Sequence, residues 1–126
     1  MIENNLELSC LPHTWLIDID GTVFLHNGHL SGTDEILPGV KEFWNNLPDE
    51  DTIILLSART TKEAEQTIKA LNLYELRFDQ ILFEIPHGER IVINDKKPSG
   101  LNTAYALNIE RNFGLSKLSM SIHKDW

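Results

Sequence analysis

Cysteine is nearly absent from this chain, since Cys10 is the only one among 126 residues. A single cysteine excludes an internal disulfide bond, and we expect a reducing, cytoplasmic environment. Long apolar runs are also lacking, because no stretch approaches the roughly 20 apolar residues that span a membrane. The first twenty residues have neither a basic start nor an apolar run, so we expect no secretory signal peptide.

Basic residues are scarce as well: 11 Lys and Arg stand against 19 Asp and Glu, which gives a formal net charge of −8. Such an acidic surface disfavours binding to nucleic acid or to an anionic membrane. Hydrophobic residues make up 41% and charged residues 24% of the chain, as is typical of globular proteins. We therefore expect one domain over residues 1–126, with its core at about residues 14–109.

Four short apolar runs are the main signal for β-strands. They occupy residues 15–17, 53–56, 81–83 and 91–93, and residues 104–107 form a weaker fifth candidate. Each run is unbroken rather than alternating with polar residues. This pattern is typical of strands in a parallel sheet that is covered on both faces.

Two helices are predicted between the first three runs. The first has apolar residues at helical spacing, and the second begins with a capping-box pattern that leads into a buried stripe. The residues concerned are Val40, Phe43, Trp44 and Leu47 in the first helix, and Thr60, Glu63, Ala64, Ile68 and Leu71 in the second. Strands alternating with helices predict an α/β fold with a mostly parallel sheet.

One connection does not fit this pattern. Only residues 84–90 separate the third and fourth runs, and they include Pro86 and Gly88. A helical crossover between parallel strands needs about a dozen residues. Three alternatives stay open: the segment is an extended return, one of the two runs is antiparallel, or one of them is not a strand.

Polar residues gather where the predicted strands end, which is where ligands bind in an open α/β sheet. Asp18 and Asp20 follow the first run, and residues two apart on a strand point the same way. Ser57 follows the second run and Asp95 the fourth. Three carboxylates at one edge suit Mg²⁺, which prefers oxygen ligands. The alternative is a simple Asp-Gly turn, but the third acid favours the metal site.

The segment Asp18-Ile19-Asp20-Gly21-Thr22 resembles the first motif of the haloacid dehalogenase (HAD) superfamily. Ser57 is similar to the second motif, and Asn94-Asp95 to the fourth. The resemblance covers roughly residues 14–109 and implies a single three-layer Rossmannoid domain, with too few residues between the motifs for a cap domain. The surroundings of Ser57 and Asp95 are also similar to small phosphatases of capsule and surface-sugar biosynthesis.

The resemblance implies a Mg²⁺-dependent phosphomonoesterase that acts through an aspartyl-phosphate on a phosphorylated sugar or related small metabolite. Asp18 would be the nucleophile, and Asp20 the general acid and base, roles that carboxylates can fill. Ser57 would hydrogen-bond a phosphoryl oxygen. Mg²⁺ would be held by Asp18, by Asp20 through its backbone carbonyl, and by Asp95. The substrate-binding residues would be Gly21, Thr22, Ser57, Ala58, Arg59 and Lys97.

The sequence departs from the family at the third motif, a lysine that bridges nucleophile and phosphate. Arg90 lies in the corresponding region, but at the start of a parallel strand it would be at the opposite edge of the sheet. We expect Lys96 to supply this charge as a catalytic residue, with Lys97 and then Arg59 as alternatives. The missing lysine favours a second hypothesis, a catalytically weak HAD-like binding or regulatory module. A receiver domain is a third, but its paired acids are adjacent rather than spaced as here.

Residues 23–37 follow the first motif and include His26 and His29. Two histidines three residues apart can bind a metal, but no cysteine or third ligand accompanies them in the sequence. We therefore favour a β-hairpin flap near the mouth of the site. Because a capless enzyme acts on large substrates or borrows a lid from a neighbouring subunit, a homo-oligomer that supplies the lid in trans is a further expectation.

Overall fold

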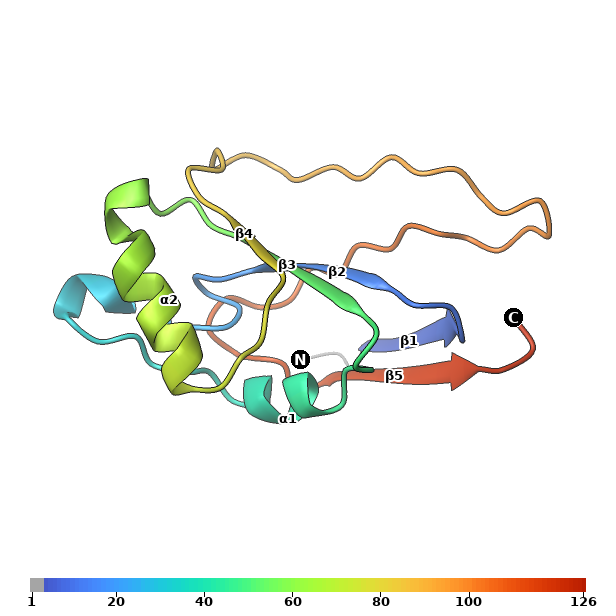
Figure 1. The fold of residues 1–126 in the computed structure, drawn as a ribbon, viewed down its shortest axis with the longest axis horizontal. Coiled ribbons are helices and arrows are strands. Elements are labelled where there is room, and N and C mark those ends of the chain that lie inside the picture. The colour runs from blue at the N-terminus through green and yellow to red at the C-terminus, as the bar shows by residue number, and fades with distance from the viewer. Residues whose placement is uncertain (1–3) are drawn as a thin grey trace.

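The computed structural model describes residues 4–126 and has an α/β fold with parallel strands (Figure 1). The central sheet contains β2 (Thr14–Asp18), β3 (Thr52–Leu56) and β4 (Gln80–Leu82), in the order β2-β3-β4. All its strand pairs are parallel. These strands are the first three predicted runs, so this part of the prediction is confirmed.

Both predicted helices are confirmed. The first is α1 (Val40–Asn45), which buries three of the predicted apolar positions, and the fourth, Leu47, is buried just beyond its end. The second is α2 (Ala64–Leu73), which continues from a short 3-10 helix, η2 (Thr61–Glu63), with the predicted capping box at its start. Within α2, Thr67 and Leu71 are fully buried. No helix within residues 4–126 is long and apolar enough to cross a membrane.

The central sheet is covered on one face only, which corrects the prediction of strands buried on both faces. Ile17, Ile53 and Leu55 point into the core that α1 and α2 complete. On the other face Leu16 and Leu82 are exposed. The register of the strands places these two residues on the same side of the sheet.

The fourth and fifth apolar runs are not strands, so these two predictions are wrong. Ile91 is 81% exposed and Ile93 is 92% exposed. Residues 83–117 contain no helix or strand and form a long excursion, drawn from yellow to red in Figure 1. The connection over residues 84–90 is too short for a crossover, and the chain leaves the sheet after β4. Of the three open alternatives, the structure has the last: the run at 91–93 is not a strand.

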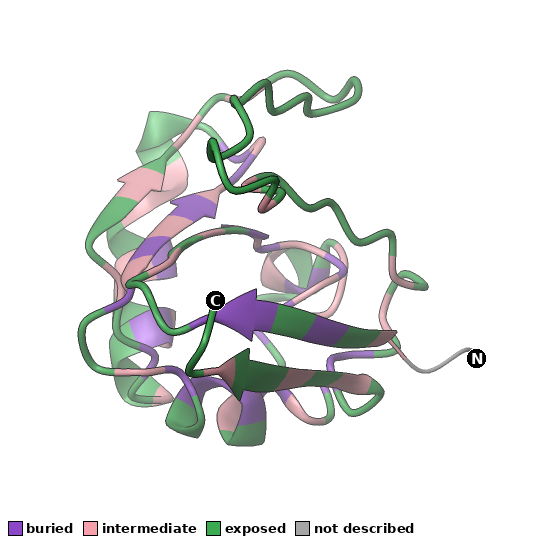
Figure 2. Cartoon of the chain, turned by 90° about the vertical axis from the view of Figure 1, so that its right-hand side faces the viewer, coloured by how far each residue is buried: buried purple, intermediate pink, exposed green. Residues whose placement is uncertain are grey.

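A second, two-stranded sheet joins opposite ends of the described chain. Its strands are β1 (Asn4–Ser9) and β5 (Leu118–His123), which pair in parallel. They lie outside residues 14–109. β1 contains buried and exposed residues, whereas β5 has only intermediate and exposed ones, as the stripes in Figure 2 show. Leu118 and Met120 of β5 pack against the main core. Neither strand was predicted, because each has only a short alternating pattern.

Asp51 links the beginnings of β2 and β3. Its buried carboxylate accepts hydrogen bonds from the Trp15 indole at 2.9 Å and from the His13 backbone N–H at 3.0 Å. The His13 ring nitrogen Nδ1 lies 2.8 Å from the same carboxylate. Burial raises the pKa of Asp51, but these hydrogen bonds outweigh it and leave the pKa below its usual value.

We expect Asp51→Asn to lower the free energy of unfolding at pH 7 by about 1–3 kcal/mol, because an amide cannot accept both hydrogen bonds and pair with the His13 ring. A lowered folded pKa means that the contribution of Asp51 is complete above its ordinary pKa of 3.8 and is lost as the pH falls through the lower folded value. The difference between variant and wild type should therefore shrink in acid. Urea unfolding at pH 7 and at steps below pH 4 measures this, and a pH-independent difference would contradict it.

Candidate active site

The chain turns sharply after β2, where the first motif lies. The Ile19 backbone carbonyl accepts hydrogen bonds from the backbone N–H groups of Val23 at 2.9 Å and Phe24 at 3.0 Å, which closes the turn. Gly21 within it has φ of +88°, where any side chain would be strained. Residues 18–22 therefore form an Asp-Gly turn and also carry the two acidic side chains.

Asp18 is the accessible acid of this turn. Its side chain is 35% exposed at the end of β2. The Thr22 hydroxyl donates to Asp18 Oδ2 at 3.1 Å, and the Arg90 guanidinium donates to Asp18 Oδ1 at 2.6 Å. The prediction that Arg90 lies at the opposite edge of the sheet is wrong, because residues 91–93 are not a strand and the excursion brings Arg90 to the carboxyl end of β2.

Asp20 is held by a different arginine, Arg59. Five hydrogen bonds of 2.7–3.0 Å join the Arg59 guanidinium to both oxygens of Asp20, both oxygens of Asp34 and the Thr67 hydroxyl. A guanidinium has five N–H donors, so Arg59 has none left for a substrate phosphate. In this geometry Arg59 cannot serve as the substrate-binding residue or the alternative cation that the sequence suggested.

This arginine network is buried. Asp34 and Arg59 are both almost inaccessible to solvent, and the Tyr74 hydroxyl donates to the Asp34 backbone carbonyl at 3.0 Å. Burial alone would lower the pKa of Arg59, but its hydrogen bonds to Asp20 and Asp34 outweigh burial and raise the pKa above its ordinary value. Arg59 is therefore a fixed positive charge.

Ser57 follows β3 as predicted but is fully buried. Its hydroxyl oxygen accepts a hydrogen bond from the Arg59 backbone N–H at 3.0 Å. Its backbone N–H donates to the Leu82 carbonyl, and its backbone carbonyl accepts a hydrogen bond from the Ile85 N–H. The neighbouring Ala58 is half-buried. Ser57 thus stabilises the turn after β3, and its hydroxyl does not face solvent, where a phosphoryl group would approach.

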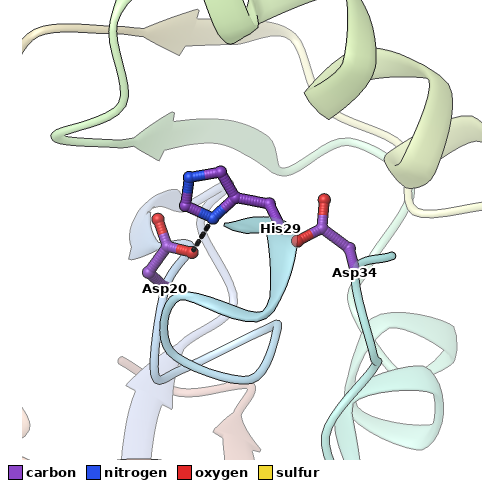
Figure 3. A group of neighbouring side chains, drawn as sticks. All are labelled: Asp20, His29 and Asp34. Carbon is purple, nitrogen blue, oxygen red and sulfur yellow. Dashed lines mark ion pairs between the residues drawn. The ribbon is translucent and has the colours of Figure 1, made fainter. Parts of the chain in front are cut away.

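The structure does not assemble the predicted metal ligands Asp18, Asp20 and Asp95. Among residues 4–126, the group of three ligating side chains whose atoms approach within 4.8 Å is Asp20, His29 and Asp34 (Figure 3). Asp95 is exposed on the excursion, because the strand expected to carry it does not form. The residues present therefore do not fit the predicted three-acid Mg²⁺ site.

Lys96 and Lys97 do not reach the site either. Both are exposed on the same excursion, and neither forms an ion pair with a carboxylate of the described chain. A direct contact between one of them and Asp18, one form of the prediction, is therefore not seen among residues 4–126. Arg90 takes that position instead.

Arg111 is a second arginine beside the turn that the sequence analysis missed. Its side chain lies over Gly21, where an added Cβ would come 3.1 Å from Arg111 Cγ. The next residue, Asn112, donates its backbone N–H to the Gly21 carbonyl at 2.8 Å. Arg90 and Arg111 come from opposite ends of the excursion, and no sequence motif marks either of them.

Residues 23–37 pair with each other in the way expected of a flap. Phe24 and Ile36 form an antiparallel bridge, and a short 3-10 helix, η1 (Gly28–Ser31), lies between them. The segment brings His29 and Asp34 to Asp20. His26 is not part of this group.

Three comparisons, with protein-family models, with curated proteins and with solved structures, find no significant match to this chain. The likeness to the HAD superfamily therefore depends on the motif residues alone.

Proposed function

We propose that the protein is a phosphomonoesterase of the HAD type in which Asp18 accepts the phosphoryl group of a phosphorylated sugar or related small metabolite. The observation that carries the proposal is the accessible Asp18 carboxylate at the end of a parallel strand, bound directly to Arg90. Carboxylates accept phosphoryl groups in covalent catalysis. A guanidinium beside the acceptor neutralises charge on the transferring oxygens, which is most of what phosphoryl transfer requires.

In the proposed reaction, an Asp18 oxygen forms a bond to phosphorus while the bond from phosphorus to the leaving oxygen breaks. The leaving oxygen takes a proton from Asp20. Water then attacks the phosphorus of the aspartyl-phosphate, gives its proton to Asp20 and releases inorganic phosphate and the Asp18 carboxylate. Because the three-acid set is not assembled, no step is assigned to Mg²⁺, and metal dependence stays a prediction for the assay.

One observation favours a second candidate, a catalytically weak binding or regulatory module. Both oxygens of Asp20 accept hydrogen bonds from Arg59, so a proton on Asp20 removes the negative charge that pairs with this arginine. In such a module, a phosphorylated ligand would bind beside Asp18 and Arg90 without efficient transfer.

The two candidates differ in turnover. We would assay the purified full chain with a generic aryl phosphate and a panel of phosphorylated sugars, with Mg²⁺ and with a chelator. Release of phosphate is expected for the enzyme, and the comparison of Mg²⁺ with the chelator tests the predicted metal dependence. Saturable binding of a phosphorylated sugar without release of phosphate would favour the module, and neither binding nor release would contradict both.

Arg90 provides a direct test of the site. Arg90→Gln should lower kcat/KM by about 10²-fold or more, because one charged donor to the transferring oxygens is lost. Arg90→Lys keeps the charge and should lose less. Lys96→Gln tests the assignment made from the sequence alone, in which Lys96 supplies this charge. If Lys96→Gln abolishes turnover and Arg90→Gln does not, the cation comes from Lys96 and the role proposed for Arg90 is wrong.

A further inference from the structure

The imidazole of His29 has one ring nitrogen with a partner and one without. Its side chain is only 9% exposed, and Nε2 lies 2.6 Å from Glu63 Oε2. Nδ1 is buried with no hydrogen-bond partner. It faces Asp20, with 3.8 Å between Nδ1 and Asp20 Oδ1 (Figure 3).

Glu63 determines which nitrogen of His29 carries the proton. The backbone N–H of Thr60 donates to Glu63 Oε1 at 3.0 Å, which leaves Glu63 Oε2 to accept a hydrogen bond from His29 Nε2 at 2.6 Å. In the neutral ring the lone pair is then on Nδ1, directed at a carboxylate, an arrangement that is repulsive unless a cation lies between them.

The charges around His29 do not balance. Asp20, Asp34 and Glu63 are three carboxylates, and Arg59 is the one guanidinium bound to this group. With a neutral His29 ring, two negative charges are left uncompensated in this partly buried cluster, which is costly. Each carboxylate oxygen has two lone pairs, so the oxygens of Asp20 and Asp34 that bind Arg59 can each accept a further partner.

We propose that Asp20, His29 and Asp34 bind a divalent transition-metal ion of the Zn²⁺ type, with Glu63 orienting His29. Mixed imidazole and carboxylate donors suit such ions, and a metal-bound histidine typically donates its other N–H to a carboxylate. A dication balances the two excess charges. Bonds of about 2.0–2.1 Å place tetrahedral ligands about 3.4 Å apart, so small side-chain movements close the site around the ion. A bound ion and the proton of the proposed reaction would compete for Asp20, so the site is tested by metal binding and not by turnover.

The test is a titration of the metal-free full chain with Zn²⁺, read by calorimetry, and with Co²⁺, read by visible absorption. We expect one ion per chain. His29→Gln should weaken binding by about 100-fold or more as a ligand is lost, and Glu63→Gln by about 10-fold as its support is lost. The matched control is His87→Gln, an exposed histidine on the excursion, which should bind as wild type does.

Further measurements make the result decisive. Thermal unfolding of each variant separates loss of binding from loss of folding, and Asp34→Asn provides a second ligand variant. The Co²⁺ spectrum should lack a thiolate charge-transfer band, which excludes Cys10 as a ligand. The proposal is overturned if the wild type shows no saturable Zn²⁺ binding, if His29→Gln binds equally well, or if NMR finds a proton on Nδ1 of His29 at saturating Zn²⁺.

Discussion

Asp18→Asn is expected to reduce turnover of an aryl phosphate to background, a loss on the order of 10⁴-fold or more. The neutral amide cannot form the acyl-phosphate bond, because its oxygen is a poor nucleophile and its nitrogen has no available lone pair. The amide keeps the size of the carboxylate and an oxygen that can still accept the hydrogen bond from Arg90 at the same position. Initial rates at saturating substrate measure the effect.

Two matched Asp→Asn variants accompany this experiment. Asp20→Asn should slow turnover by about 10²- to 10⁴-fold, the usual contribution of general acid–base catalysis. Asp49→Asn changes an exposed acid far along the chain from the site and should leave turnover unchanged. Near-native turnover by Asp18→Asn would show that this residue is not the phosphoryl acceptor.

Arg59→Met is expected to lower the free energy of unfolding by about 3–5 kcal/mol, because it leaves two carboxylates without their cation. The loss is a large part of the stability of a typical domain, which is about 5–15 kcal/mol. Since the pKa of Arg59 is raised above its ordinary value, which is already far above neutrality, its contribution is complete at pH 7 and does not titrate near neutrality. Urea unfolding at pH 7 measures the loss.

Three variants separate charge from packing at this position. Arg59→Lys keeps the charge but offers three donors in place of five, so an intermediate loss is expected. Adding Asp34→Asn to Arg59→Met removes one buried charge and should recover part of the stability. Lys69→Met changes an exposed helical ion pair and should shift stability by less than about 0.5 kcal/mol. A loss for Arg59→Met no larger than that of Lys69→Met would contradict the structural role of Arg59.

Local sequence patterns were sufficient to predict β2, β3 and the two helices. Apolar spacing and the capping contact between Thr60 and Glu63 involve residues only a few positions apart. The run at residues 91–93 has the same local pattern, yet it is exposed, because a strand also needs a neighbour that its connections allow it to reach. β1 and β5 were missed for the converse reason: each finds its partner at the opposite end of the described chain.

The sequence by itself determined that an acidic turn follows a strand of a parallel sheet, since residues 18–22 are adjacent in the chain. Only the tertiary structure decided which cation serves each acid. Arg90 is 72 positions from Asp18, and Arg59 is 39 positions from Asp20. Hydrogen bonds form over about 3 Å, so these pairings depend on the path of the excursion and of residues 23–37. Periodicity describes which face a residue occupies on its own element, and it contains no information about that path.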